Sequence, residues 1–157
     1  MSRTTRATQA LQQAGVAFTL HAYDYDPEAQ SIGLQAAQAL GAAPATVLKT
    51  LMAEVDNRPV CVVLPSDREV GMKSLARAFA GKTARMMRPP DAERLTGYVV
   101  GGISPFGQKR RVPTVFEEAA LEHDFVFINA GQRGLQVRLD PEEAVAVLHA
   151  AVAAIAV

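Results

Sequence analysis

The residues best suited to chemistry gather in a glycine-rich segment at positions 96–109, TGYVVGGISPFGQK. Gly101 and Gly102 carry no side chain, so their backbone N–H groups can approach a ligand oxygen closely and form an anion or oxyanion pocket. A bulge or tight loop between two strands is an equally common use of such a pair. The segment alone leaves both interpretations open.

Three known motifs fail on this segment. A phosphate-binding P-loop requires Gly-Lys followed by Ser or Thr, whereas Gly107 is followed by Gln108. The glycine spacing does not match a dinucleotide-binding fingerprint. A nucleophile elbow needs one residue fewer between Gly102 and Gly107, and Pro105 lacks the N–H that the residue after an elbow serine donates to the oxyanion. Ser104 is therefore not predicted to be an attacking serine.

A second feature is Lys49, which lies inside the apolar run at positions 47–53. Its ammonium group either snorkels to solvent or points into a pocket, where it would pair with a phosphate or a developing negative charge. In a regular strand the neighbouring Thr50 points to the opposite face. Both side chains would then reach one site only where the strand is twisted or bulged.

Cysteine and histidine are scarce, with one Cys and three His in 157 residues. Cys61 lies in an apolar run and is predicted to be a buried, inert thiol. No pair among His21, His123 and His149 has metal-ligand spacing, so neither a metal nor a cofactor is expected. A chain with no elbow serine, Cys–His couple or metal cluster must use water or a nucleophile that the substrate supplies.

The formal net charge of zero hides an asymmetry. Residues 73–111 contain nine basic and two acidic residues, a net charge of +7, so the remainder carries −7. This segment is interpreted either as solvated helix faces or as a contact for a local anionic partner. In the second case the acidic remainder would discourage broad coating of nucleic acid.

The elements that must position these residues alternate irregularly. Helices are predicted at 4–13, 31–40, 72–79 and 89–97, and a core helix is predicted through the apolar C-terminal run 144–157, which carries His149. Strands are predicted at 16–20, 47–53, 59–64, 98–100, 112–116, 125–129 and 135–139, the second and third of them forming a hairpin. Several turns are too short for crossover helices, which favours an α+β domain with a mixed sheet.

One domain over residues 1–157 is expected at this length. The C-terminal apolar run falls short of the 18 or so residues that a membrane span needs, so no membrane association is expected. The first 15 residues show no basic-then-apolar leader, and a single Cys forms no internal disulfide. These features predict a cytoplasmic protein.

The segment TGYVVGGISPFGQKRRVPT resembles the signature of the YbaK/EbsC family of free-standing aminoacyl-tRNA deacylases, in particular its YbaK branch. The likeness extends to residues 18–27, 47–51, 73–81 and 131–135. The Gly-Gly-Ile-Ser-Pro run is its specific part, because sister branches that clear Ala or Ser carry a different loop. The resemblance implies a curved, mixed, barrel-like β-sheet with flanking helices, as in the editing domain of bacterial prolyl-tRNA synthetases.

The resemblance also implies a trans-editing deacylase that clears Cys from mischarged tRNA(Pro), and from tRNA(Cys), without a cofactor. The thiol of the substrate cysteine would attack its own ester, release the tRNA and leave a cyclic thiolactone. Tethering gives such a thiol a large effective concentration. Expected partners are the acceptor end of an aminoacyl-tRNA and prolyl- or cysteinyl-tRNA synthetase. The alternatives are hydrolysis of Ala-, Ser- or Thr-charged tRNA by activated water, and a non-catalytic module that binds tRNA or a synthetase.

By the same resemblance, Lys49 holds the 3′-terminal nucleotide or the reacting ester, and the backbone of Gly101 and Gly102 faces the ester carbonyl. The implied substrate-binding residues are Tyr23, Thr50, Ile103, Ser104, Pro105, Asn129, Arg133, Gly134 and Gln136. The tRNA phosphates are expected to contact Lys73, Lys109, Arg110 and Arg111. The chain departs from the family at Asn129, where Ser is usual, and at Gln136, where Asp is common. The lost carboxylate bears on recognition of the substrate's α-ammonium group and hence on amino-acid preference.

Overall fold

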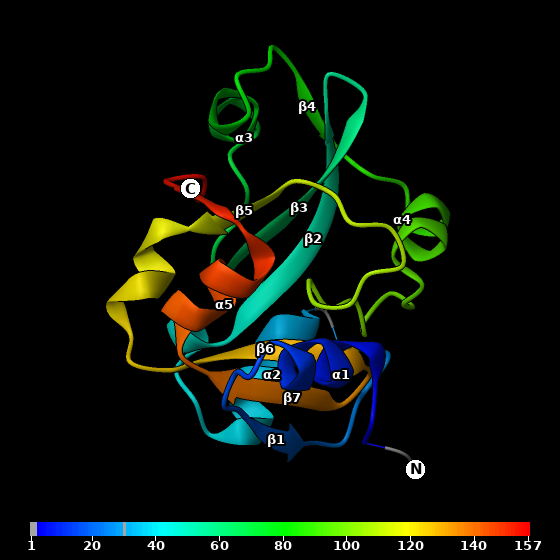
Figure 1. The fold of residues 1–157 in the computed structure, drawn as a ribbon, viewed down its shortest axis with the longest axis vertical. Coiled ribbons are helices and arrows are strands. Elements are labelled where there is room, and N and C mark those ends of the chain that lie inside the picture. Colours follow the sequence, from blue (N-terminus) through cyan, green and yellow to red (C-terminus); the bar gives the residue numbers. More distant parts are fainter. Residues whose placement is uncertain (1–2, 30) are drawn as a thin grey trace.

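The strands form two open sheets (Figure 1). A computed structural model describes residues 3–29 and 31–157, so residues 1, 2 and 30 of the expected domain lie outside the described residues. The antiparallel sheet has the order β1-β7-β6, with β1 at Thr19–Ala22, β6 at Val126–Gln132 and β7 at Leu135–Leu139. The expected α+β class with a mixed sheet is confirmed, but the strands do not close into a barrel.

The second sheet has five strands in the order β4-β2-β3-β5-β8. Its strands are β2 at Leu48–Val55, β3 at Arg58–Pro65, β4 at Ala84–Met86, β5 at Thr114–Glu117 and β8 at Ala151–Ala153. The predicted hairpin is confirmed as β2 and β3. Asp56 and Asn57 connect them with φ angles of 50° and 67°, the left-handed pair that a tight hairpin turn requires. The sheet is mixed, because β5 runs parallel to β3 and to β8.

The helices lie close to their predicted positions because local signals define their ends. α2 (Ile32–Leu40) begins after Ser31, whose hydroxyl accepts from Leu34 N, and ends at Gly41, which has a left-handed conformation. The remaining helices are α1 (Arg6–Gln13), α3 (Met72–Ala78), α4 (Pro89–Thr96) and α5 (Pro141–Leu148), with short 3-10 helices at Pro44–Thr46 and Glu118–Glu122.

The predicted C-terminal helix is wrong beyond Leu148. His149 has a φ of 49° and ends α5 in the left-handed region, where it is exposed. The chain then forms β8, which pairs with β5, and Glu117 Oε1 accepts from Ile155 N and Ala156 N at 2.9 Å each. β5 and Glu117 are distant in sequence from the C-terminal segment that they bind. The apolar periodicity of that segment alone therefore did not indicate the pairing.

Two other strand predictions also differ from the structure. Residues 98–100 form part of a loop, and the first strand lies at Thr19–Ala22 instead of 16–20. Tyr98 is nevertheless buried, and its hydroxyl donates to Phe106 O at 2.6 Å. Val99 and Val100 beside it are exposed, so this apolar run belongs to a loop that is anchored by one buried tyrosine.

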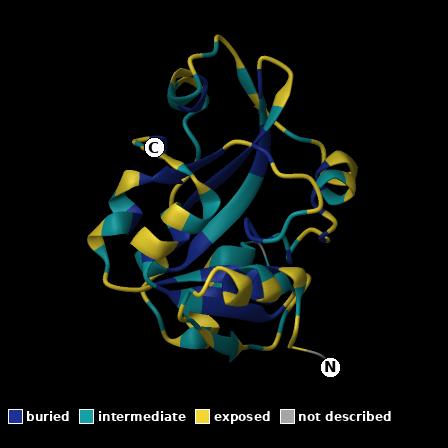
Figure 2. Ribbon diagram, viewed as in Figure 1, coloured by how far each residue is buried: buried dark blue, intermediate teal, exposed yellow. Residues whose placement is uncertain are grey.

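The two N-terminal helices pack on opposite faces of the three-stranded sheet. α1 packs with the cluster that contains Ile128 and Val137, whereas Ala36 and Ala37 of α2 pack with Phe127. Figure 2 shows buried residues running along the strands of both sheets. Since side chains alternate along a strand, Asn129 and Gln136, which are opposite each other in register, lie on the α2 face.

Candidate active site

A cavity of about 310 Å³ lies along the edge of β2. β4 pairs only with Ala53–Val55 of that strand, and Met87 N donates to Met52 O at 3.0 Å, so the edge is open along residues 48–51. The lining also comes from residues 31–33 at the start of α2, from Met86, Met87 and α4, from the loop that holds Val100, Gly101 and Ile103, and from Asn129 and Gln136. The cavity therefore gathers parts of the chain that are far apart in sequence.

Lys49 and Thr50 both line this cavity although they are adjacent in a regular strand. The open edge explains this, because side chains from either face can border a cavity that lies beyond the edge of the sheet. Lys49 Nζ lies 3.6 Å from Glu69 Oε1, and the Lys49 side chain is 19% exposed. Of the described residues that line the cavity, Lys49 is the only one with an ionisable side chain.

Several buried polar atoms around the cavity have no hydrogen-bond partner among the described residues. Thr50 Oγ1 and Gln136 Oε1 belong to lining residues, and the Tyr23 hydroxyl lies beside Gln136. Burial raises the pKa of Tyr23, so this hydroxyl keeps its proton at neutral pH. Because unsatisfied buried polar groups are costly, these atoms indicate that the cavity is built for a polar ligand.

The two glycines of the loop have different roles. Gly102 N donates to Val99 O at 2.8 Å, so its N–H is not free. A β-carbon at Gly102 would lie 2.9 Å from Arg133 N, which explains the need for glycine there. Gly101 has a φ of 91°, and its N–H donates to no group within the described residues. Gly101 also lines the cavity, so of the two glycines it is the one whose amide remains available to a ligand.

Side chains from three parts of the chain hold this loop. Glu93 Oε2 on α4 accepts from Val100 N at 2.8 Å, and Arg133 Nε donates to Val100 O at 2.9 Å. Asn129 Nδ2 on β6 donates to Gly101 O at 3.1 Å. The backbone around Gly101 is therefore fixed before any ligand binds.

Asn129 also organises the bulge at the end of β6. Its Oδ1 accepts from Gly131 N at 2.6 Å and from Gln132 N at 3.3 Å, while its Nδ2 contacts the glycine loop. A serine hydroxyl is shorter and has one hydrogen to donate, so it cannot span the same groups. Asn129 thus links the bulge of β6 to the glycine loop.

Other predicted site residues lie away from the cavity lining. Ser104 is 0% exposed, and its hydroxyl accepts from Phe106 N at 3.2 Å. Pro105 is buried beside Phe106 at a separate hollow. Gly134 is buried under Tyr23, whose N–H donates to the Gly134 carbonyl at 2.9 Å. These three residues shape the surrounding backbone and do not face the cavity.

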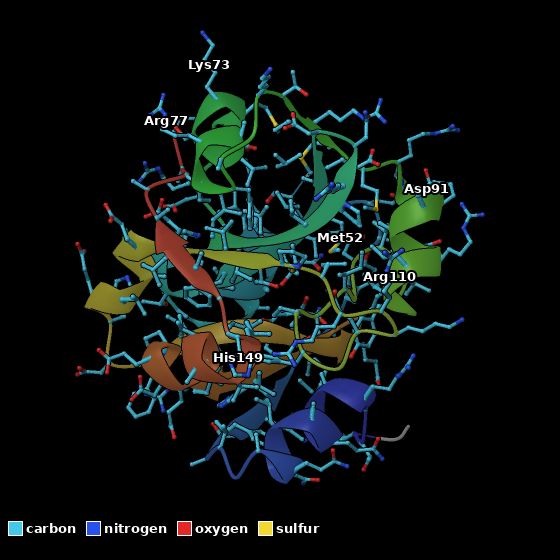
Figure 3. The ribbon with its side chains drawn as sticks, turned by 45° about the horizontal axis from the view of Figure 1, so that its top comes forward. Met52, Lys73, Arg77, Asp91, Arg110 and His149 are labelled. Atoms are coloured by element: carbon cyan, nitrogen blue, oxygen red, sulfur yellow. The ribbon has the colours of Figure 1, made fainter. Side chains whose placement is uncertain are left out.

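The predicted phosphate contacts divide into two groups. Lys73 extends from α3, whereas Arg110 lies near α4, and Figure 3 shows the two on different parts of the molecule. Arg110 and Arg111 border a second hollow together with Arg58, the first residue of β3. None of these three arginines forms an ion pair within the described part of the chain.

Cys61 is fully buried, as predicted, and burial raises the pKa of its thiol to about 12. It is protonated at neutral pH and therefore inert as a nucleophile. Across residues 3–29 and 31–157, no group of three or more His, Cys, Asp or Glu side chains is arranged to hold a metal ion. None of the helices in these ranges is long and apolar enough to cross a membrane.

Several residues at the site were not predicted from the sequence. Glu93 lies seven positions before Val100, and only the packing of α4 against the loop brings them together. Tyr25, whose ring supports the Arg133 guanidinium, lies two positions after Tyr23 in the segment that follows β1. That spacing was a usable signal, because side chains two positions apart lie on one side of an extended chain.

The sequence matches the aminoacyl-tRNA editing domain family over residues 26–146. EbsC of Enterococcus faecalis, named as a proposed Cys-tRNA(Pro)/Cys-tRNA(Cys) deacylase, is 39% identical over 108 residues. That match covers 68% of this chain and 65% of EbsC, so the chain matches slightly less than two thirds of that relative. ProXp-y of Escherichia coli, named as a multifunctional Ser/Thr-tRNA deacylase, is 24% identical over 127 residues, covering 80% of this chain and 76% of ProXp-y.

Solved structures show the same fold. The hypothetical protein APE2540 superposes with a TM-score of 0.87 and 25% identity, over 98% of this chain and all of that one. A protein described as a proposed trans-editing enzyme for prolyl-tRNA synthetase gives a TM-score of 0.82 and 23% identity, over 99% of both chains. At that identity the second likeness concerns the fold alone.

Proposed function

Because this chain belongs to the aminoacyl-tRNA editing domain family, we propose that it is a deacylase that removes cysteine from mischarged tRNA(Pro), and from tRNA(Cys). The family match also confirms the resemblance to YbaK/EbsC proteins.

The composition of the cavity is the observation that carries this proposal. Among the described residues that line it there is no His, Cys, Asp or Glu, and Lys49, its one ionisable side chain, is paired with Glu69. The lining therefore lacks the side chains that most often activate a water or a protein hydroxyl. The Ser31 hydroxyl lines the cavity but caps α2, and Cys61 is buried and protonated. A substrate that brings its own thiol needs no nucleophile from the protein.

In the proposed step, the cysteine sulfur forms a bond to its own ester carbonyl carbon. The resulting tetrahedral intermediate expels the ribose oxygen as the carbon–oxygen bond breaks. The proton lost by the thiol ends on that oxygen, and the products are tRNA with a free terminal hydroxyl and a cyclic thiolactone. The protein has to orient the ester and stabilise negative charge on its carbonyl oxygen.

Lys49 and the Gly101 amide are the groups we assign to charge stabilisation. The ammonium supplies a positive charge at the cavity wall, and the free N–H supplies a donor from a backbone that Asn129, Glu93 and Arg133 hold in place. Fixed donors of this kind need no reorganisation as charge develops. Thr50 and Gln136 supply unpartnered acceptors for the substrate's α-ammonium group.

The tRNA backbone is proposed to contact the basic surface outside the cavity. Arg110 and Arg111 have no carboxylate partner in the described residues, and Lys109 adjoins them. Lys73 lies on a different part of the molecule from Arg110 (Figure 3). A tRNA acceptor end bound at Arg110 and Arg111 is therefore not expected to contact Lys73 as well. A prolyl- or cysteinyl-tRNA synthetase is the proposed partner that delivers the tRNA.

A deacylation panel with tRNA(Pro) esters of Cys, Ser, Ala and Pro tests the proposal. The Cys ester should be cleared fastest. The 2-aminobutyryl ester replaces the thiol with a methyl group of similar size. It should be cleared at least 100-fold more slowly, because it loses the large rate advantage that a tethered nucleophile gives. Equal turnover of the Cys and 2-aminobutyryl esters would contradict attack by the substrate thiol.

A water-based deacylase of Ser- or Thr-charged tRNA is the second candidate, favoured by the likeness to ProXp-y. Thr50 Oγ1 and Gln136 Oε1 are unpartnered acceptors that would suit a substrate hydroxyl. Clearance of Ser-tRNA(Pro) as fast as Cys-tRNA(Pro) would support this candidate. Binding of tRNA without turnover of any ester would instead indicate a non-catalytic module.

A further inference from the structure

Arg133 lies next to Val100 and Gly101, two residues that line the cavity, and its guanidinium group is held in one orientation. The residue belongs to the β6–β7 turn, and its Nε donates to Val100 O at 2.9 Å. Its guanidinium carbon lies 5.4 Å from the centre of the Tyr25 ring. The guanidinium is therefore fixed at one edge by a hydrogen bond and supported by an aromatic ring.

No carboxylate pairs with Arg133 among the described residues, and the residue is exposed. A planar cation that is already ordered and has no anionic partner loses little entropy when a flat ligand stacks on it. Val99 and Val100, which are 50% and 38% exposed, add apolar surface beside it. This surface suits a flat, partly apolar group.

The Tyr25–Arg133 pair directly adjoins the proposed reaction site. A β-carbon at Gly101 would lie 2.5 Å from the Tyr25 hydroxyl oxygen and 3.3 Å from Arg133 Nε. Gly101 itself lines the cavity. A nucleotide whose 3′ ester enters the cavity therefore has its base within reach of this pair.

We propose that Tyr25 and Arg133 form a stacking platform for the 3′-terminal nucleobase of the substrate RNA. The proposal rests on the proposed function and specifies which residues hold the end of the RNA. Unpaired RNA bases commonly stack on aromatic rings and on arginine planes. A base is favoured over a phosphate here, because one edge of the guanidinium is already engaged by Val100 O and its neighbours are apolar.

The test uses a short RNA hairpin with a natural 3′ end and the same hairpin with an abasic terminal ribose. Wild-type protein should bind the natural uncharged hairpin about tenfold more tightly than the abasic one, the usual scale for one stacked base. Arg133→Ala should lose this difference and should match wild type on the abasic hairpin. The matched control is Arg138→Ala, which removes an arginine that stacks on Phe125 elsewhere in the same sheet and should keep the tenfold difference.

Two results would overturn the platform. Arg133→Lys keeps the charge but not the plane, so full recovery of affinity in that variant would indicate a phosphate contact. Equal losses for Arg133→Ala on both hairpins would show that Arg133 acts only through Val100 and the loop. The binding readout is independent of catalysis. Base-dependent binding without ester cleavage would leave the platform standing and would contradict the proposed function.

Discussion

Lys49 and Glu69 form an ion pair at the wall of the cavity, with Nζ and Oε1 3.6 Å apart. The lysine side chain is 19% exposed and the glutamate side chain 83% exposed. An ion pair with one partner in solvent adds little to stability, but it gives the ammonium group a preferred position. The positive charge of Lys49 at the cavity is therefore balanced by a carboxylate that stays in solvent, and not by a buried one.

We expect Lys49→Ala to lower kcat by about 100- to 1000-fold, the usual cost of removing one group that stabilises an oxyanion. Stability should change by less than about 1 kcal/mol, because the glutamate left behind is solvated. Single-turnover deacylation and urea unfolding measure the two effects. Lys82→Ala, which removes an exposed lysine between α3 and β4, is the control. Unchanged turnover in a folded Lys49→Ala protein would remove the catalytic assignment.

Glu69→Gln separates the lysine from its partner. The substitution keeps the size of the side chain and removes its charge, so we expect a change in kcat/KM below about fivefold, in line with the small energies of exposed pairs. Steady-state kinetics of both variants on one substrate preparation provide the comparison. A loss as large as that of Lys49→Ala would mean that Glu69 is required for function.

Asn129→Ala should destabilise the fold by about 1–3 kcal/mol, since it leaves the bulge amides and the Gly101 carbonyl without their partner. Asn129→Ser should fall between the alanine variant and wild type, because a hydroxyl replaces only part of these bonds. Urea unfolding measures both variants. Gln38→Ala on the exposed face of α2 is the control, with an expected change within about 0.5 kcal/mol. A neutral Asn129→Ala would contradict the organising role of this side chain.

Charge reversal tests the RNA-binding surface. The double variant Arg110→Glu, Arg111→Glu should weaken hairpin binding and reduce the salt slope by about 1–2, since each lost phosphate contact removes about 0.7–0.9 from that slope. Lys73→Glu on α3 is measured beside it (Figure 3). A salt slope that changes only in Lys73→Glu would place the RNA on α3 instead.

Stability should fall with alkaline pH. Burial raises the pKa of Cys61 from its ordinary 9.0 to about 12 and that of Tyr98 from 10.0 to about 12. The unfolded chain therefore loses these protons first, so the stabilisation is complete below pH 9 and is lost as the pH rises toward 12. Urea unfolding between pH 8 and 10.5 measures this. Cys61→Ala should have a shallower slope above pH 9, by at most about 1.4 kcal/mol per pH unit, and identical slopes would contradict the assignment.

The sequence alone determined the features that depend on neighbours along the chain. Ser31 and Gly41 define the ends of α2, and Asp56 and Asn57 define the β2–β3 turn, because caps and tight turns are made by contacts over a few residues. The shortage of Cys and His was visible in the composition and directed attention to a nucleophile from the substrate. The glycine loop carried the resemblance that the family match confirms.

Only the tertiary structure decided which of these residues meet. The apolar run at the C-terminus fits a helix or a strand equally well. Pairing with β5 makes Ala151–Ala153 a strand. Lys49 and Thr50 share a cavity because β4 stops short along β2, which no local pattern records. The free amide is at Gly101 because Val99, Glu93, Asn129 and Arg133 engage the rest of the loop. Contacts between segments far apart in sequence made these choices, so periodicity and local propensity could not predict them.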